Sequence, residues 1–396
     1  MGIPASMLRG LKILFLTTVL PRKRRMGSEF ASQAVIDALT ELGAEVTVVG
    51  YIRTGDDYSL DSREICAGKR HIETKGAGSH AAMWFAQSLI KRLPYSVAKF
   101  CSSAFVSSVR KVLRQENHHL VILDHVQMSW LIEAVPLGAR LIGLAHNVEH
   151  QMYQSFIGEQ KSGVRHWVYQ RESRLLREME IVFANKVDQL WVLTQSDAES
   201  FAVFKRTGSI KEIPLPGSAI PADPVPVTKE FDIGMVGSWT WRANEEALRW
   251  FFDRVYPNLP DDVAIQVAGS GAKWLEGQYG NVKYVGFVND VQQFLQRAKV
   301  VAIPTLSGGG IQIKTLDAIA SGSQIVATPL ALRGINEPPP TVRTVEDPEQ
   351  FARLLSSAMR SSDSADSAHA IEWSRLRQSR FLSQVASSVQ SLAPLN

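Results

Sequence analysis

Short apolar runs alternate with longer amphipathic segments along the first half of the chain. We predict strands at residues 11–16, 45–49, 120–124, 140–145 and 189–193. We predict helices at residues 28–42, 81–92, 101–115, 165–185 and 196–204. This alternation is typical of parallel strands joined by crossover helices. The pattern therefore predicts one α/β unit over residues 1–213, in which Ser28 caps the start of the first helix and Gly43 ends it.

A proline-rich segment at 214–228 interrupts this alternation. Its prolines are Pro214, Pro216, Pro221, Pro224 and Pro226. Proline fixes φ and lacks an amide hydrogen, so the segment cannot be a regular helix or a central strand, and we interpret it as a hinge.

The alternation restarts after the hinge and predicts a second α/β unit over residues 229–370. Its predicted elements are strands at 231–236, 263–268, 282–285, 299–303 and 324–327, with a helix from Asn244. We interpret the Ser-, Asp- and Ala-rich stretch 356–370 as a flexible link or a frayed helix. A final helix at 371–396 is predicted to pack back on the N-terminal unit. Two Rossmann-like domains would then face each other across a cleft, with ligands outside the carboxyl ends of the strands.

Composition narrows the class of protein. The 396 residues, 45% of them hydrophobic, suffice for two domains with separate cores. Lys and Arg number 43 against 39 Asp and Glu, a net charge of +4 without a long block of one sign. This balance excludes a protein whose whole surface neutralises phosphates. We expect no nucleic-acid partner, because the cations are not interleaved with aromatic residues along one predicted sheet.

Cysteine content and hydropathy bear on the compartment. Two cysteines are too few for a disulfide framework or a structural zinc site, so reduced thiols in the cytoplasm are expected. Lys12 interrupts the apolar run at 11–20, and Pro21 follows it, unlike a secretory signal. No stretch approaches the roughly 18 apolar residues of a membrane span. We therefore expect a cytoplasmic protein, whose membrane contact could only be peripheral, on the inner face. The apolar segment 81–93 could lie in a membrane interface, although a core or acceptor-covering helix is favoured.

The most distinctive segment follows the predicted strand that ends at Ile303. Three glycines at 308–310 let the backbone approach a ligand, and amides of Gly309, Gly310 and Ile311 at a helix start suit a diphosphate. Lys314 and Asp317 lie three apart on one helical face, so a cation and an acceptor could act on one ligand. The other interpretation is a glycine turn with a surface Lys–Asp pair, since neither nucleotide-binding glycine pattern is present here.

An ordered set of segments resembles a known family. Residues 237–244, 267–271, 285–288, 298–304 and 316–328 are similar, in order and spacing, to the donor domain of retaining GT-B glycosyltransferases of the family-four type. Many of those enzymes assemble bacterial polysaccharides and glycolipids. The resemblance covers most of 231–335 and implies a GT-B fold and a nucleotide-diphosphate sugar donor. It implies donor-binding roles for Gly237, Ser238, Gly269, Phe287, Gly309, Gly310, Ile311, Lys314 and Asp317.

The chain departs from this family at two motifs of the donor domain. The family's Glu-x7-Glu motif has Asp317 at its second position, which binds the ribose, but Gly309 at its first, which holds the donor sugar. Without that first carboxylate, the donor sugar lacks one of the contacts that the family uses to hold it, and the activity itself could be lost. The family's basic pair after the first donor strand is reduced to Arg242, which we predict contacts phosphate; the alternative is an exposed arginine at a helix start. Trp239 and Trp241 could wall the cleft, although tryptophans more often pack in the core.

The N-terminal half carries a second matching segment, on the acceptor side. A predicted strand runs into His146, Asn147, Val148 and Glu149, which resembles the family's His-Asn-x-Glu segment. The resemblance places His146 at a strand end, where it can donate to a sugar hydroxyl or to the transferring centre. Glu149 is the weaker candidate for a site residue, because an acid at a helix start can have a purely local role.

A basic loop at residues 22–25 precedes Gly27 and Ser28, where the family carries a glycine-rich loop. Arg24 and Arg25 would suit an anionic acceptor or an anionic membrane face. A solvated loop is the alternative.

Together these residues predict sugar transfer with retention of configuration to a glycan, lipid-linked or protein-linked hydroxyl. His146, Lys314 and Arg242 are the predicted catalytic residues. No metal or other cofactor is expected, because the sequence holds no Asp-x-Asp motif to chelate a diphosphate through a cation. A nucleotide-sugar 2-epimerase and a non-catalytic sugar-nucleotide-binding protein remain the alternative functions.

Overall fold

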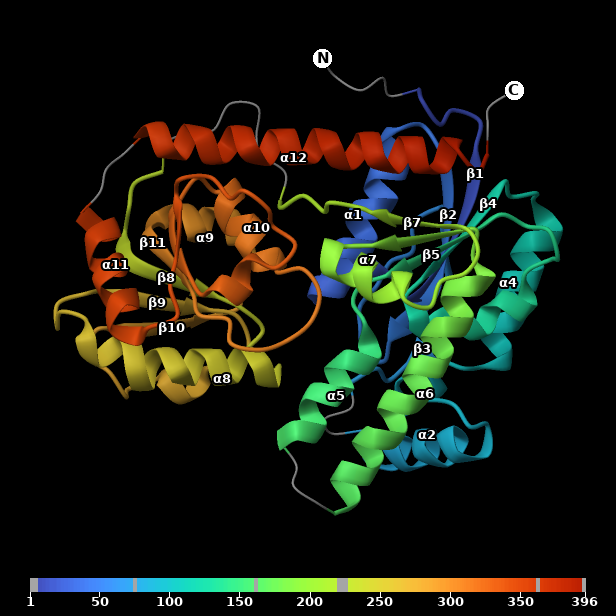
Figure 1. Ribbon diagram of the computed structural model, residues 1–396, viewed down its shortest axis with the longest axis horizontal. Helices are drawn as coiled ribbons and strands as arrows, with labels where there is room; N and C mark the ends of the chain where they lie inside the picture. Colours follow the sequence, from blue (N-terminus) through green and yellow to red (C-terminus); the bar gives the residue numbers. More distant parts are fainter. Residues whose placement is uncertain (1–5, 74–76, 160–162, 219–226, 361–363, 394–396) are drawn as a thin grey trace. The chain divides into compact units, whose positions relative to one another are not determined.

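A computed structural model describes residues 6–73, 77–159, 163–218, 227–360 and 364–393. The chain divides into two compact units. The first unit comprises Met1–Ile213 together with Leu382–Asn396, and the second comprises Pro214–Phe381. Both are built on a parallel sheet with helices on its two faces (Figure 1).

The first unit contains a seven-stranded parallel sheet in the order β3-β2-β1-β4-β5-β6-β7. Its strands are β1 (Lys12–Val19), β2 (Glu45–Arg53), β3 (Glu64–Arg70), β4 (Leu120–Asp124), β5 (Leu141–Ala145), β6 (Gln189–Val192) and β7 (Ser209–Glu212). Its helices are η1 (Pro21–Lys23), α1 (Gly27–Glu41), α2 (Ser79–Ile90), α3 (Tyr95–Ala98), α4 (Ser103–Gln115), η2 (Val126–Ala134), α5 (Glu149–Glu159), α6 (Val164–Lys186) and α7 (Gln195–Ala202).

The middle of this sheet explains why its strands form unbroken apolar runs in the sequence. Residues 13–16 of β1 are completely buried, and β1 pairs with β2 on one side and β4 on the other. A parallel strand covered by helices on both faces has no polar face, so apolar residues do not alternate with polar ones. The strand order reverses between β1 and β4, which places the expected ligand position of such a sheet at their carboxyl ends.

The second unit contains a six-stranded parallel sheet in the order β10-β9-β8-β11-β12-β13. Its strands are β8 (Phe231–Val236), β9 (Ile265–Ala268), β10 (Val282–Gly286), β11 (Ala298–Ile303), β12 (Gln324–Ala327) and β13 (Val342–Thr344). Its helices are α8 (Arg242–Trp250), η3 (Phe251–Val255), η4 (Tyr256–Asn258), η5 (Lys273–Leu275), α9 (Val291–Arg297), α10 (Ile313–Ala320), η6 (Pro329–Leu332), α11 (Pro348–Arg360) and the start of α12 (Ser364–Gln390). Figure 1 shows α9 and α10 on one face of this sheet and α8 and α11 on the other. The order reverses between β8 and β11.

Two predicted details differ from the structure, and a third, the hinge, lies partly outside the described residues. Ser28 does not cap α1, because the helix begins at Gly27 with Met26 at the N-cap. The 356–370 stretch is mostly helical, since α11 runs to Arg360 and α12 begins at Ser364; residues 361–363 lie outside the described part. Of the hinge, residues 219–226 also lie outside it, and residues 214–218, 227 and 228 form neither helix nor strand.

The C-terminal helix α12 starts seven residues before the predicted position 371, and its last turns belong to the first unit. The Gln189 Nε2 atom donates to the Ser388 carbonyl at 3.2 Å and to Ser391 Oγ at 2.7 Å. Gln390 Nε2 donates to the Met7 carbonyl at 3.1 Å. These bonds attach the chain's last helix to β6 and to the segment that precedes β1.

Candidate active site

Four elements of the first unit meet at one carboxylate. Asp124 is the last residue of β4, and its side chain is completely buried. Its Oδ2 atom lies 2.6 Å from Thr17 Oγ1 of β1 and 2.7 Å from Ser32 Oγ of α1. Its Oδ1 atom lies 2.6 Å from Nε2 of His146, which follows β5. His146 was predicted from the sequence but Asp124 was not, because an acid at the end of an apolar strand carries no motif of its own.

A second imidazole covers this pair. His125 has a left-handed backbone, with φ at +73°, and its ring stacks on that of His146 with centroids 3.9 Å apart and planes at 12°. Burial lowers the pKa of His125 to about 3, so its ring is neutral at pH 7. The stacked neutral ring restricts how far the His146 imidazole can tilt.

The Asp124 carboxyl is ionised at neutral pH in spite of its burial. Burial acts to raise its pKa, but the neighbouring imidazoles and the hydrogen bonds from His146 and Thr17 outweigh burial and lower the pKa to about 2. A buried carboxylate with this many donors is stable only as the anion.

The same residues are the group in the described part of the chain that could hold a metal ion. Ligand-type atoms of Asp124, His125 and His146 all lie within 4.8 Å of one another. A metal bonds in the plane of a ligating imidazole, so two rings stacked face to face do not direct their lone pairs to one point. The arrangement fits a hydrogen-bonded pair under a covering ring better than a metal centre.

Glu149 is the first residue of α5 and is buried close to His146. Burial raises the pKa of its carboxyl to about 7, and the charge of Glu180 acts in the same direction. A hydrogen bond from Gln127 and the charges of His146 and Lys99 act in the opposite direction. Glu149 therefore exchanges its proton near neutral pH.

The basic loop is largely neutralised within the first unit. Arg22 bonds Glu64 at 2.9 Å, Arg24 bonds Asp37 at 2.6 Å and Arg25 bonds Asp56 at 2.8 Å. Lys23 donates to the Asp57 carbonyl. These cations thus tie the loop to its surroundings in the unit.

Gly27 and Ser28, which follow the basic loop, lie closer to the buried Asp124 carboxylate than the loop's arginines do. Gly27 begins α1, and the Ser28 carbonyl lies 2.9 Å from Ser32 Oγ, the hydroxyl that also reaches Asp124. The Ser32 hydroxyl, which has one hydrogen to donate, thus lies between the Ser28 carbonyl and Asp124, whereas Arg24 and Arg25 bond acids elsewhere in the unit.

In the second unit, the ends of β8 and β9 approach so closely that only glycine fits. Gly269 has a φ of +106°, and a Cβ atom there would lie 1.8 Å from the Gly237 carbonyl oxygen. The Gly237 amide donates to the Ala268 carbonyl at 3.2 Å, and the Gly269 amide donates to the Gly286 carbonyl at 2.6 Å. Trp239, predicted as a possible cleft wall, is buried, and its indole donates to the Ala268 carbonyl at 2.8 Å.

Lys314 connects helix α10 to the loop after β8. Its Nζ donates to Asn244 Oδ1 at 3.1 Å, and Asn244 Nδ2 donates to the Ser238 carbonyl at 3.0 Å. Burial lowers the pKa of Lys314 to about 8. The ammonium thus stands beside the point at which the strand order reverses, and it is positioned by Asn244, to which the sequence pattern assigned no role.

The glycine loop before α10 is held from outside. Arg333 donates through Nε to the Gly310 carbonyl at 2.5 Å, and its guanidinium also bonds the Gly308 carbonyl. Helix α10 begins at Ile313, so the amides of Gly309, Gly310 and Ile311 belong to the loop that precedes it. Within the described part of the chain, none of these three amides donates a hydrogen bond.

Asp317, the predicted ribose ligand, faces the first residues of the proline-rich hinge. Its Oδ1 atom accepts from the Ser218 amide and from the Ser218 hydroxyl, both at 2.8 Å. At Gly217 a Cβ atom would lie 2.5 Å from the Leu316 carbonyl oxygen, so the hinge packs against α10. One oxygen of the Asp317 carboxylate therefore anchors the start of the hinge.

The remaining predicted donor residues lie on the surface of the second unit. Arg242 begins α8 and bonds Glu246, one turn later, at 2.6 Å with its side chain half exposed. Phe287 follows β10 and is 77% exposed. Both side chains are thus more open to solvent than Lys314, which is partly buried.

Comparison with known proteins decides the fold. Sucrose-phosphate synthase from Thermosynechococcus elongatus superposes with a TM-score of 0.66 at 14% identity, covering 96% of this chain and 98% of that one. HepE from Anabaena, in complex with UDP and glucose, gives 0.59 at 14% identity over 98% and 100%. A TarM variant from S. aureus, in complex with UDP among other ligands, gives 0.63 at 11% over 97% and 100%. The chain has the GT-B fold.

The family match lies in the second unit of this GT-B chain. Residues 230–361 match the family described as Glycosyl transferases group 1. No curated protein matches the chain by sequence. The matched stretch includes Gly237, Gly269, Lys314 and Arg333. The contacts described above for the second unit therefore lie within the residues that match the family.

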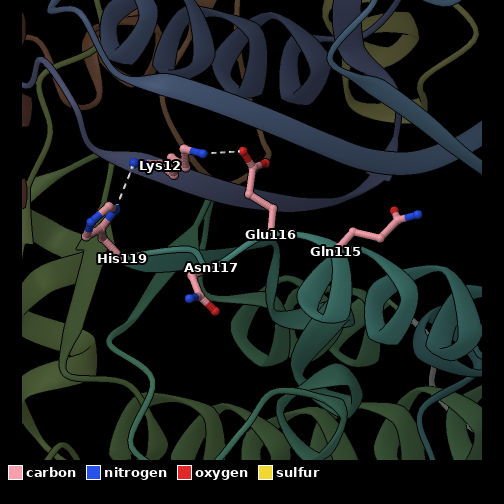
Figure 2. A pocket seen from close by; sticks show the side chains of 5 residues that line it. All are labelled: Lys12, Gln115, Glu116, Asn117 and His119. Atoms are coloured by element: carbon pink, nitrogen blue, oxygen red, sulfur yellow. Dashed lines mark hydrogen bonds and ion pairs between the residues drawn. The ribbon is translucent and has the colours of Figure 1, made fainter.

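A hollow on the first unit of this GT-B chain lies at the amino ends of β1 and β4, opposite the carboxyl ends at which Asp124 and His146 lie. Figure 2 shows Lys12, Gln115, Glu116, Asn117 and His119 around it. Lys12 opens β1, and its Nζ bonds Glu116 at 2.6 Å while its amide donates to His119 at 3.0 Å. Ligands of parallel sheets bind at the carboxyl ends, so we assign no substrate to this hollow.

Among the helices of the described residues, none has the length and hydropathy that crossing a membrane requires.

Proposed function

We propose that this protein is a glycosyltransferase that moves a sugar from a nucleotide-diphosphate sugar to a hydroxyl acceptor. The observation that carries the proposal is Lys314, a partly buried ammonium held by Asn244 beside the strand-order reversal of the unit that matches the group 1 family. The complex of HepE with UDP and glucose supports a donor of this class.

Departure of the nucleotide diphosphate builds negative charge, which the second unit is suited to stabilise. We infer that Lys314 and the loop amides of Gly309, Gly310 and Ile311 bind the diphosphate. Fixed donors aimed at developing charge are the largest single contribution to many enzymes' rates. Arg242 adds a cation from the start of α8. The glycine at 309 leaves the donor sugar to be held by backbone amides in place of a carboxylate.

We propose that the first unit binds the acceptor and that the anomeric configuration is retained. We infer that His146 and Glu149 contact the acceptor hydroxyl or the donor sugar. Same-face attack, in which the leaving phosphate assists deprotonation of the acceptor hydroxyl, needs no protein carboxylate as nucleophile. The product would belong to polysaccharide, glycolipid or glycoconjugate biosynthesis.

A thermal-shift panel of nucleotide diphosphates, followed by their sugars, tests the proposal first. Saturating ligand at 100 times its Kd stabilises the folded protein by about 2.7 kcal/mol, so one base should raise Tm clearly above the others. Radiolabelled sugar transfer with the selected donor should then require an acceptor. Donor conversion without any acceptor would favour an epimerase, and binding without turnover across acceptors would favour a non-catalytic binding protein.

Metal removal is expected to leave transfer unchanged. The charge that a chelated cation would supply to the diphosphate comes, in this proposal, from Lys314 and the loop amides. Sugar transfer should therefore have the same kcat before and after dialysis against EDTA, and added Mg²⁺ or Mn²⁺ should not raise it. Loss of activity that Mn²⁺ or Zn²⁺ restores would contradict metal independence.

A further inference from the structure

The buried carboxylate of Asp124 can act on a substrate only through His146. Its side chain has no exposed surface, and both of its oxygens already have donors. Those donors come from β1, α1 and the end of β5, so the position of Asp124 is fixed from three directions. A group this enclosed orients its neighbour rather than touching a ligand.

The hydrogen bond between Asp124 and His146 determines which ring nitrogen carries the hydrogen. An ionised carboxylate only accepts hydrogen bonds, so the Nε2 atom at 2.6 Å must carry a hydrogen. In the neutral imidazole, Nδ1 then has none and offers a lone pair. Across the described residues, Nδ1 of His146 has no hydrogen-bond partner.

His125 prevents the ring from choosing another arrangement. Its imidazole lies flat against that of His146 at 3.9 Å, and its own Nε2 stays 3.6 Å from Asp124 Oδ2. Turning the His146 ring over would exchange Nε2 for a carbon and would leave Asp124 Oδ1 without its donor. Loss of a hydrogen bond to a buried charge is costly, so one ring orientation is strongly preferred.

We propose that Asp124 is a positioning residue that fixes His146 as a hydrogen-bond acceptor, through Nδ1, for a hydroxyl group of the substrate. The identity of that substrate as a sugar donor or its acceptor rests on the proposed function. The assignment reverses the direction expected from sequence, in which His146 donates to a hydroxyl. Either the donor sugar or the acceptor can supply a hydroxyl of this chemistry.

The tautomer can be measured without knowing any substrate. In ¹⁵N NMR of histidine-labelled protein at pH 7, the His146 signals, assigned by their absence in His146→Gln, should show hydrogen on Nε2. In Asp124→Asn, the amide oxygen can still accept from Thr17 and Ser32 while its NH₂ group donates to Nε2, so the hydrogen should move to Nδ1. A wild-type protein with hydrogen on Nδ1 overturns the proposal, whether or not the variant folds.

Asp188→Asn is the matched control. Asp188 Oδ2 accepts from the Leu141 amide at 2.7 Å, so this carboxylate is bonded to the opposite end of β5. Its replacement also removes one negative charge beside the same strand. The control should leave the His146 signals and kcat at their wild-type values, and a shift in the control equal to that in Asp124→Asn overturns the specific role of Asp124.

Kinetics then identifies the hydroxyl. Asp124→Asn should lower kcat for sugar transfer about 10-fold or more, as expected when a substrate hydroxyl loses the hydrogen bond that orients it. If calorimetry shows that the variant loses the affinity that the sugar adds to the nucleotide diphosphate, the hydroxyl belongs to the donor. If that added affinity stays and only acceptor-dependent transfer falls, it belongs to the acceptor. Wild-type values for both quantities overturn the proposal. Absence of transfer in the wild-type protein would refute the proposed function, while the NMR result would still decide the tautomer.

Discussion

Replacing Lys314 by alanine is expected to weaken binding of the nucleotide diphosphate about 10- to 100-fold, as loss of a charge-assisted hydrogen bond of about 1.5–3 kcal/mol implies. The effect on kcat should be larger, about 100- to 1,000-fold, because charge on the leaving diphosphate grows toward the transition state. Calorimetry with the nucleotide diphosphate and steady-state kinetics with its sugar measure the two effects. Lys299→Ala is the control, since this β11 lysine is half exposed and bonds Asp232 at 2.8 Å.

The pH dependence gives the same prediction a sharper form. Burial lowers the pKa of Lys314 to about 8, so the free protein loses this positive charge as pH rises through 8. A bound diphosphate favours the ammonium and raises its pKa in the complex. Affinity should therefore fall as pH rises above about 8, where up to one proton is taken up on binding, and little proton uptake by Lys314 is expected at pH 7. In Lys314→Ala the fall in affinity above pH 8 and the proton uptake should both disappear. If this variant keeps the wild-type pH dependence of binding, Lys314 does not contact the diphosphate.

The second large effect is expected from Gly269→Ala. A Cβ atom at this position would lie 1.8 Å from the Gly237 carbonyl oxygen, and a φ of +106° strains any other residue. Relief requires β8 and β9 to separate at their carboxyl ends, which should cost on the order of 3 kcal/mol in free energy of unfolding. Denaturant unfolding of the full chain measures this loss.

Gly277→Ala separates the close approach from backbone strain alone. Gly277 has a φ of +73°, and no atom lies within 4 Å of the position that a Cβ would occupy, so the cost there should be only about 1 kcal/mol. Because Gly237 and Ser238 follow β8 at the predicted donor site, Gly269→Ala should also weaken nucleotide-diphosphate binding, whereas Gly277→Ala should not. Equal losses of stability in the two variants would show that the approach of β8 and β9 tolerates a methyl group.

Much of the fold was predictable because buried parallel strands leave a strong local signal. Strands β1, β4, β5 and β6 each contain four or more buried residues, most of them apolar, and each lies where the sequence predicts one. Strands β3, β7 and β13 were missed. Their residues are mostly half-buried and include several charged side chains, so they resemble loops until a neighbouring strand supplies hydrogen-bond partners.

The candidate site was predictable only in part, because its contacts join residues far apart in sequence. The glycines before α10 and Lys314 form a recognisable local pattern, and His146 stands at the end of an evident strand. Arg333, which holds the glycine loop, lies on a later segment and looks like an ordinary surface arginine in the sequence. The basic loop shows the opposite error, since its adjacent cations look unpaired in sequence while their partners lie on other segments.

Sequence alone was enough to predict two parallel-sheet units and the strand ends at which chemistry was expected. Hydrophobic periodicity, glycine and proline affect the backbone over a few residues, so their effects can be predicted without knowing which distant segment packs against them. Only the folded chain reveals that Thr17 and Asp124, 107 residues apart, share a hydrogen bond. The same is true of the bond by which Asp124 holds His146 and of the contact between Asp317 and Ser218. Such pairs exist only once strand order has brought distant strand ends together, because a side-chain hydrogen bond forms only over about 3 Å.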